Sequence, residues 1–152
     1  MIEVHEIEAI QDSWGQALIH VGQADTWDEA YERALELVES HYLLTGEPLL
    51  FCPTKAAERQ FRGTRKDAVS YFVGQDPDHP EDQGFALEPW HSVRFENAGL
   101  VCREGLAMVM GNYFFGRADG TEQKVEYSFV YVRNENGALR IQLHHSALPY
   151  PG

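Results

Sequence analysis

The sequence predicts an α+β fold, in which a curved antiparallel sheet forms a cone and N-terminal helices pack on its concave face. The first observation is the helical spacing of apolar residues near the start of the chain. The second is a series of strand-like runs in the last third, joined by Asp-Gly and Asn-Gly turns that are typical of antiparallel hairpins. The third is their order, since helices that precede a sheet in the chain indicate an α+β layout.

Two amphipathic helices are expected near the N-terminus. Apolar residues recur at intervals of three and four across residues 3–21, and Gly22 ends the pattern. Thr26 and Glu29 have the spacing of a capping box, in which a hydroxyl and a carboxylate satisfy exposed backbone donors. This cap predicts a second helix that extends to about Leu44. The aromatic residues in both apolar stripes are interpreted as core.

The middle of the chain alternates short elements with turns. Thr64 resembles another N-cap and predicts a short helix through Phe72, closed by Gly74. Residues 75–84 are uniformly polar and contain two prolines, so their carboxylates and His79 are expected in a solvated loop rather than in a cation site. Extended segments are expected at residues 48–52, 90–95 and 98–103, with a bend or bulge at residues 96–97.

The last third of the chain predicts three antiparallel strands, at residues 106–115, 124–132 and 139–147. Successive side chains of a strand point to opposite faces of the sheet. The second strand therefore places four large apolar residues on one face: Val125, Tyr127, Phe129 and Tyr131.

The last strand ends in two histidines and a serine. By the alternation rule His144 should share a face with Gln142 and Ser146, and His145 should face the other way with Ile141. Two interpretations stay open from the residues alone. Both imidazoles could form local hydrogen bonds at the end of a strand, or one imidazole and the Ser146 hydroxyl could lie at the mouth of a pocket.

Both faces of the predicted sheet carry apolar residues. Met108 and Met110 lie opposite Ala107 and Val109, although strands with one wet face should alternate apolar and polar residues. Helices can cover one face, and a second subunit is a natural cover for the other. A homodimer is therefore expected.

Length and charge limit the class of protein. A chain of 152 residues fits a single domain, residues 1–152, and its formal net charge of -12 argues against nucleic acid and anionic membrane as partners. No apolar run is long enough to span a bilayer, and the acidic N-terminus lacks the regions of a signal peptide. Cys52 and Cys102 are expected to be free, buried thiols, which suits a reducing compartment and a cytoplasmic location.

Motifs for metal or nucleotide chemistry are absent from the sequence, including the P-loop, the dinucleotide fingerprint, HExxH and CxxC. A zinc hydratase needs three converging ligands, whereas the adjacent His144 and His145 should diverge on a regular strand. We therefore expect neither a metal nor another cofactor. The polar residues in apolar surroundings are mainly hydroxyls and imidazoles, which can orient a neutral substrate and a water or bind a small anion: Thr54, Tyr71, Tyr113, Glu126, His144, His145 and Ser146.

Three segments of the chain resemble one enzyme family. They are LLFCPTKAAERQFRGTRKDAVSYFVG at residues 49–74, MGNYFF at residues 110–115 and LHHSALPY at residues 143–150. These segments are similar to the iota class of carbonic anhydrases, within the nuclear-transport-factor-two-like superfamily of α+β cones. The helix-helix-sheet order and the C-terminal strands also resemble the association domain of calcium/calmodulin-dependent kinase II.

The resemblance implies interconversion of carbon dioxide and bicarbonate without a metal. By motif, the family's substrate-binding threonine, tyrosine and serine fall on Thr54, Tyr71 and Ser146, beside His144 and His145. We expect one pocket imidazole to act as a base while the hydroxyls align water and carbon dioxide. The apolar substrate suits walls formed by Phe51, Phe72 and Val73.

This chain departs from the family at one site position. The family typically ends HHSS, and here Ala147 replaces the second serine. If the second hydroxyl were the working one, activity would be lost.

Two other functions remain open from the sequence. A non-catalytic association module would form a large ring. An isomerase or dehydratase of the same superfamily would need a carboxylate base in the pocket, for which Glu126 is the obvious strand candidate.

Overall fold

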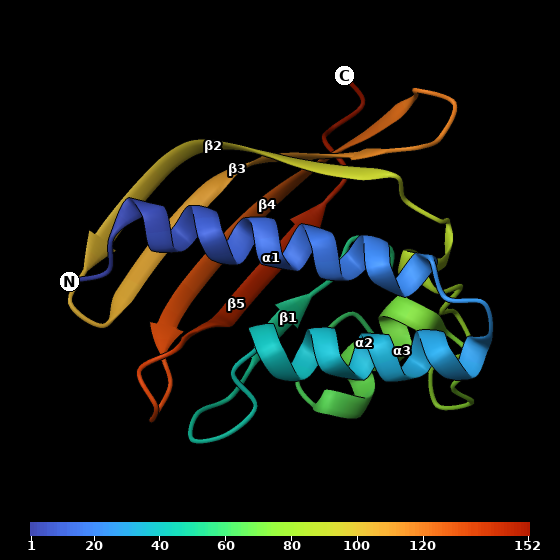
Figure 1. Ribbon diagram of the computed structural model, residues 1–152, viewed down its shortest axis with the longest axis horizontal. Helices are drawn as coiled ribbons and strands as arrows, with labels where there is room; N and C mark the ends of the chain where they lie inside the picture. The colour runs from blue at the N-terminus through green and yellow to red at the C-terminus, as the bar shows by residue number, and fades with distance from the viewer.

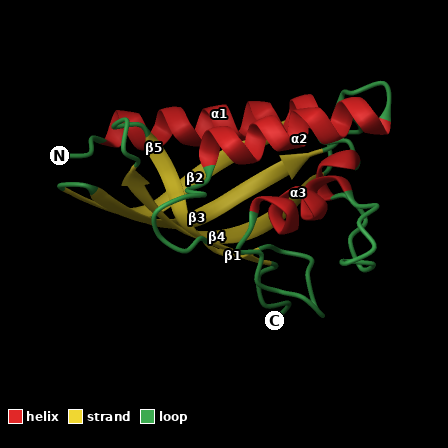
Figure 2. Cartoon of the chain, turned by 90° about the horizontal axis from the view of Figure 1, so that it is seen from below, coloured by secondary structure: helices red, strands yellow, loops and turns green.

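The structure is a computed structural model that describes residues 1–152 in two layers. One layer is a five-stranded sheet in the order β1-β5-β4-β3-β2. Helix α1 runs across this sheet (Figure 1), and α1 and α2 lie on the same side of it (Figure 2). The predicted α+β layout is confirmed. The elements are α1 (Val4–Gly22), α2 (Trp27–His41), β1 (Leu50–Cys52), α3 (Arg65–Val73), a 3-10 turn (Phe85–Leu87), β2 (Ser92–Arg103), β3 (Leu106–Gly116), β4 (Glu122–Arg133) and β5 (Leu139–Ala147).

Helix α2 begins as predicted but ends early. Its Thr26 hydroxyl accepts a hydrogen bond from the Glu29 backbone N–H at 3.1 Å. The helix ends at His41 rather than near Leu44, because Tyr42 is extended and bridges to Ile141 of β5 in parallel register. Hydrogen bonds to the sheet thus replace another helical turn, and they fix the Tyr42 side chain beside β5.

The sheet is antiparallel from β2 to β5, and it contains one strand pairing that the sequence did not predict. Strand β1 adds to β5 in parallel, so that Phe51 pairs with His144 and Cys52 with His145. The two segments predicted at residues 90–95 and 98–103 form the single strand β2, with a register shift between Asn97 and Gly99 where the bend or bulge was expected.

A second bulge changes which residues of β5 face inward. The register of β4 and β5 shifts between Val130 and Tyr131, so that Tyr131 pairs with Ile141 and Phe129 with His144. Ile141 and His144 are consequently both buried. The predicted alternation was wrong here, because the extra residue at Gln142 reverses the facing of Ile141 relative to His144.

The concave face of the sheet and the apolar stripe of α1 form one core. The four large residues predicted on one face of β4 are all buried. They meet α1 residues that include Trp14, whose ring is stacked on Tyr113 at 5.8 Å between centroids. As a result, aromatic rings enclose the inward-facing side chains at the C-terminal end of β5.

The opposite face of the sheet is open in a single chain. Met110 is 64% exposed, and Met108 and Val101 are also exposed. Cys52 and Cys102 are free but half-buried rather than buried as expected, because they lie in β1 and β2, the two edge strands of the sheet. None of the helices has the length and apolar character required to cross a membrane.

Candidate active site

A small cavity lies between α1, α3 and the C-terminal end of β5. Its free volume is about 10 Å³, which is roughly the space of one water. Its walls combine aromatic rings with hydroxyls and one imidazole: Trp14, Phe51, Pro53, Thr54, Tyr71, Phe72, Phe85, Tyr113, His144 and Ser146.

His144 is the centre of a hydrogen-bond network in this cavity. Its Nδ1 lies 2.9 Å from the Tyr42 hydroxyl and its Nε2 lies 3.0 Å from the Tyr113 hydroxyl. The ring is stacked between Phe51 and Phe129, at 4.9 Å and 4.2 Å between centroids. Burial, with a smaller contribution from His145, lowers the pKa of His144 to about 3, so the imidazole is neutral near pH 7.

The hydroxyls of three residues continue the network from His144. The Tyr113 and Ser146 oxygens are 2.5 Å apart, and the Ser146 and Thr54 oxygens are 2.6 Å apart. Thr54 follows β1, whereas Ser146 lies near the end of β5. The parallel pairing of these strands therefore brings together groups separated by 92 residues in the chain.

Tyr71 extends from α3 to the other side of the cavity. Its oxygen accepts a hydrogen bond from the Lys55 backbone N–H at 3.1 Å, and its ring is stacked on Phe85 at 5.6 Å between centroids. Burial raises the pKa of the Tyr71 hydroxyl above its usual range, so the group stays protonated. Since the Lys55 N–H can only donate, the hydrogen of the Tyr71 hydroxyl remains for another partner.

An enclosed ion pair holds α3 and the neighbouring loops together. Arg62 and Asp82 are both fully buried and form two hydrogen bonds, at 2.7 Å and 2.8 Å. Arg62 also donates to the Asp67 carbonyl at 3.0 Å, and its guanidinium lies 6.0 Å from the centre of the Tyr71 ring. These contacts fix the helix that carries Tyr71.

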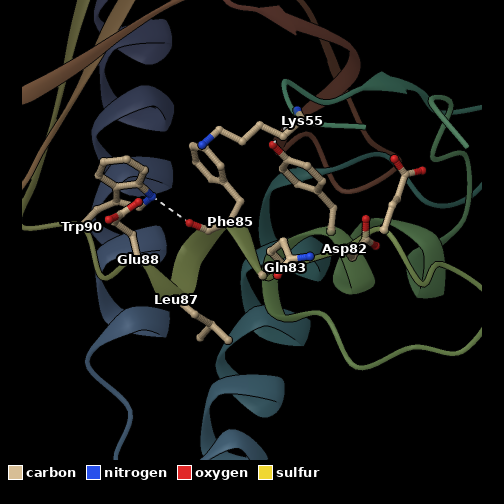
Figure 3. A pocket seen from close by; sticks show the side chains of 10 residues that line it. Lys55, Asp82, Gln83, Phe85, Leu87, Glu88 and Trp90 are labelled. Carbon is tan, nitrogen blue, oxygen red and sulfur yellow. Dashed lines mark hydrogen bonds between the residues drawn. The ribbon is translucent and has the colours of Figure 1, made fainter. Parts of the chain in front are cut away.

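An outer pocket of about 290 Å³ adjoins the cavity, and Tyr71 and Phe85 line both. Figure 3 shows the Lys55 side chain extending toward the Phe85 ring, while the Trp90 indole donates to the Phe85 carbonyl. The Lys55 ammonium lies 5.9 Å from the centre of that ring. The Tyr71 and Phe85 rings therefore separate the outer pocket from the buried hydroxyls.

The structure brings most of the predicted site residues together. Thr54, Tyr71, His144 and Ser146 line the cavity, with Phe51 and Phe72 in its apolar wall. Val73 is buried but is not part of that wall.

Three residues discussed in the sequence analysis lie outside the cavity. His145 is exposed because it follows the inward-facing His144 on β5. Ala147 and Glu126 pair with each other in the sheet and line a shallow pocket on its outer face. Glu126 is exposed and therefore unsuited to be the base of an enclosed pocket.

Sequence reasoning missed several contributors to the site. Trp14 and Tyr42 were interpreted only as core, and Phe85 was not singled out. Tyr113 was named among the polar residues that can orient a substrate, but its contact with His144 was not foreseen. A signal was present in Tyr42, because a tyrosine in a buried stripe needs a partner for its hydroxyl. No group of three or more His, Cys, Asp and Glu side chains is arranged to hold a metal ion.

Comparisons with known proteins agree with this arrangement. Residues 5–148 match the family model of metal-independent carbonic anhydrase. A metal-independent carbonic anhydrase from a Nostoc species is 38% identical over 149 residues, which span 95% of this chain and 73% of that protein.

Solved structures support the same conclusion. An iota-carbonic anhydrase from a cyanobacterium, crystallised with bicarbonate, has a TM-score of 0.95 at 35% identity, covering 99% of this chain and 94% of that one. A putative calcium/calmodulin-dependent kinase II association domain from Xanthomonas campestris has a TM-score of 0.63 at 18% identity, covering 100% of this chain and 91% of that one, and shares the fold alone. With most of its length matched by the family model and by a relative of this identity, the chain belongs to the metal-independent carbonic anhydrases, enzymes of the iota class that interconvert carbon dioxide and bicarbonate.

Proposed function

We propose that carbon dioxide and bicarbonate are interconverted at the boundary between the outer pocket and the buried cavity, on the hydroxyls of Thr54, Tyr71 and Ser146. The observation that carries the proposal is the convergence of these three hydroxyls in an apolar, aromatic cavity. Hydroxyl donors match the oxygens of bicarbonate, and the aromatic wall suits the apolar carbon dioxide molecule. The bicarbonate in the cyanobacterial relative is consistent with such a ligand.

The chemistry proposed for this site depends on orientation. In hydration, a water oxygen bonds to the carbon atom of carbon dioxide, one carbon–oxygen π bond becomes an oxyanion, and a proton leaves the water. Thr54 and Tyr71 donate hydrogen bonds to the oxyanion, which lowers the barrier because the donors are fixed before the charge develops. The proton leaves through water in the outer pocket, which Tyr71 and Phe85 border.

The role of His144 differs in this account from that of a base in contact with water. Both ring nitrogens bind tyrosine hydroxyls, and burial holds the pKa of the ring at about 3. A base is most effective when its pKa lies near the working pH. We therefore assign His144 the task of holding Tyr113 and, through it, Ser146.

Paired substitutions at adjacent positions test the site. Ser146→Ala removes a hydroxyl from the cavity, whereas His145→Ala removes an exposed side chain from the next position of the same strand. We expect the first variant to lose most carbon dioxide hydration, measured by stopped flow, and the second to keep it. Equal activity in both variants, with the fold intact by circular dichroism, would overturn the site assignment.

We also propose that two subunits associate through the outer face of the sheet. The support is the group of exposed apolar residues on neighbouring strands: Val101, Met108 and Met110. Light scattering after size exclusion should give a dimer, and Met110→Lys should give a monomer. A large ring would favour the association-module reading instead.

We also propose a cytoplasmic location, because Cys52 and Cys102 form no disulfide and free thiols suit a reducing compartment. Fractionation of the source cells with an antibody against the chain tests it, since recovery outside the cytoplasm would contradict the proposal.

A further inference from the structure

Trp14 and Tyr42 impose a direction on the hydrogen bonds around His144. An indole N–H can only donate, and the Trp14 Nε1 lies 3.1 Å from the Tyr42 oxygen in a buried position. Tyr42 therefore accepts this hydrogen bond. The only other hydrogen-bond partner of its hydroxyl is His144 Nδ1, at 2.9 Å.

The Tyr42 hydroxyl must then donate to His144. Tyr42 is 1% exposed, so its hydrogen would have no acceptor if His144 Nδ1 also carried a proton. A buried donor without an acceptor is unfavourable and rare in folded proteins. Nδ1 is consequently the unprotonated nitrogen, and the proton of the neutral ring is on Nε2.

The direction set at Tyr42 continues to the substrate side of the cavity. His144 Nε2–H donates to Tyr113, Tyr113 donates to Ser146, and Ser146 donates to Thr54, because each oxygen has one hydrogen to give. The chain of donors ends at Thr54, whose own hydrogen is not needed by Ser146. In the protein alone this hydrogen is donated to the Tyr71 oxygen, which offsets part of the increase that burial causes in the pKa of Tyr71, and it can turn from there to a bound anion.

We propose that Trp14 and Tyr42 are positioning residues that hold His144 in its Nε2–H tautomer and so leave the Thr54 hydroxyl as a donor to bicarbonate. The inference rests on the proposed function of Thr54, but the tautomer can be measured without activity. With the opposite direction, Thr54 would donate to Ser146 and present lone pairs to the anion. Trp14 and Tyr42, two residues remote from the substrate, thereby decide whether the Thr54 hydroxyl presents its hydrogen or a lone pair to the bicarbonate anion.

Nitrogen NMR of the ¹⁵N-labelled enzyme tests the direction. The two ring nitrogens of a neutral histidine have different chemical shifts according to which one carries the proton, and the His144 signals are those lost in His144→Ala. We expect the wild-type spectrum to show protonated Nε2 and unprotonated Nδ1. This test uses the unaltered protein, so protonated Nδ1 in that spectrum would overturn the proposal.

Trp14→Phe tests the part assigned to the indole, because it keeps an aromatic ring and removes the N–H. In the unaltered protein only the Nδ1–H tautomer leaves a Tyr42 group without a partner, whereas in the variant each tautomer leaves one, either the Tyr42 oxygen or its hydrogen. The Nδ1–H tautomer should therefore become populated, and kcat/KM should fall by roughly 10-fold to 100-fold. Trp27→Phe is the matched control, since Trp27 donates its indole N–H to the Val73 carbonyl at 2.9 Å, away from His144. An unchanged His144 tautomer in folded Trp14→Phe would overturn the role of Trp14, and so would the same tautomer change in Trp27→Phe.

Discussion

The Thr54 and Ser146 hydroxyl oxygens lie 2.6 Å apart, although 92 residues separate them in the chain. The contact exists because β1 pairs in parallel with β5, which brings the residues after β1 to the C-terminal end of β5. One of the two hydroxyls must donate to the other, so the pair acts as a unit.

Removing either hydroxyl of this pair should impair hydration by a similar amount. We expect Thr54→Val and Ser146→Ala each to lower kcat/KM by about 10²-fold to 10³-fold, the usual loss for one preorganised donor to a developing oxyanion. The double variant should be little worse than either single one, because the contributions share one hydrogen bond. Stopped-flow hydration by the wild type, the two single variants and the double variant completes this double-mutant cycle. Losses of kcat/KM that multiply fully in the double variant would show that the two hydroxyls act independently.

Tyr71→Phe should separate binding from packing. The variant keeps the ring stacked on Phe85 but removes the hydroxyl that faces the cavity. Activity should fall strongly, while the free energy of unfolding should drop by only about 1 kcal/mol, since the Lys55 N–H loses one acceptor. Urea unfolding and stopped flow on the same preparation check both values. Full activity in the variant would remove Tyr71 from the site.

Ala147→Ser restores the residue that the family usually has, and we expect it to change hydration less than about two-fold. The reason is geometric, because Ala147 pairs with Glu126 and lines the outer face, whereas Ser146 lines the cavity. Stopped-flow comparison with the wild type checks this. A large gain in activity would instead show that the working hydroxyl is at position 147.

The stability of the fold should depend on pH through His144. Its pKa is about 3 in the folded chain because of burial and, to a smaller extent, His145, whereas the ordinary value is 6.5. The unfolded chain therefore binds one more proton between these values, and stability is lost as pH falls from about 6.5 toward 3, by at most about 1.4 kcal/mol per pH unit. Urea unfolding across this range checks the slope. His144→Asn should flatten it, and an identical slope in the variant would show that other groups dominate.

The buried ion pair beneath α3 should matter for stability. Asp82→Ala leaves the buried Arg62 guanidinium without its hydrogen-bonded carboxylate, and the Glu81 carboxylate at 3.8 Å is then the nearest negative charge. Loss of one partner costs about 3–5 kcal/mol for pairs of this kind. Lys66→Ala is a suitable control, since its salt bridges to Asp76 and Asp78 involve an exposed ammonium. Chemical unfolding of both variants gives the comparison. Similar small losses in both would mean that Asp82 contributes little.

Local signals explain why much of the fold could be predicted from the sequence. The capping pair at Thr26 and the cap at Thr64 begin helices where expected, because a side-chain hydroxyl satisfies nearby backbone donors in each. The three strands in the last third of the chain follow from the apolar residues that recur at every second position and from the turn residues between the strands. These features depend on neighbours within a few positions of the chain.

The sequence-based predictions that were wrong concern residues whose conformation is set by pairing with strands distant in the chain. Tyr42 lies at the end of a helical pattern, yet the bridge to Ile141 makes it extended and turns it toward His144. The bulge in β5 is set by its pairing with β4, so strict alternation misplaced Ile141. The motif resemblance identified Thr54, Tyr71 and Ser146, but it could not indicate the supporting Trp14 and Tyr42, whose role depends on three-dimensional contacts.

The most direct measurement is stopped-flow hydration of carbon dioxide by protein treated with chelator, with metal content determined in the same sample. We expect full activity without bound metal, and loss of that activity in Ser146→Ala but not in His145→Ala. Inactive protein whose activity returns with zinc or manganese would contradict a mechanism based on hydroxyl groups alone.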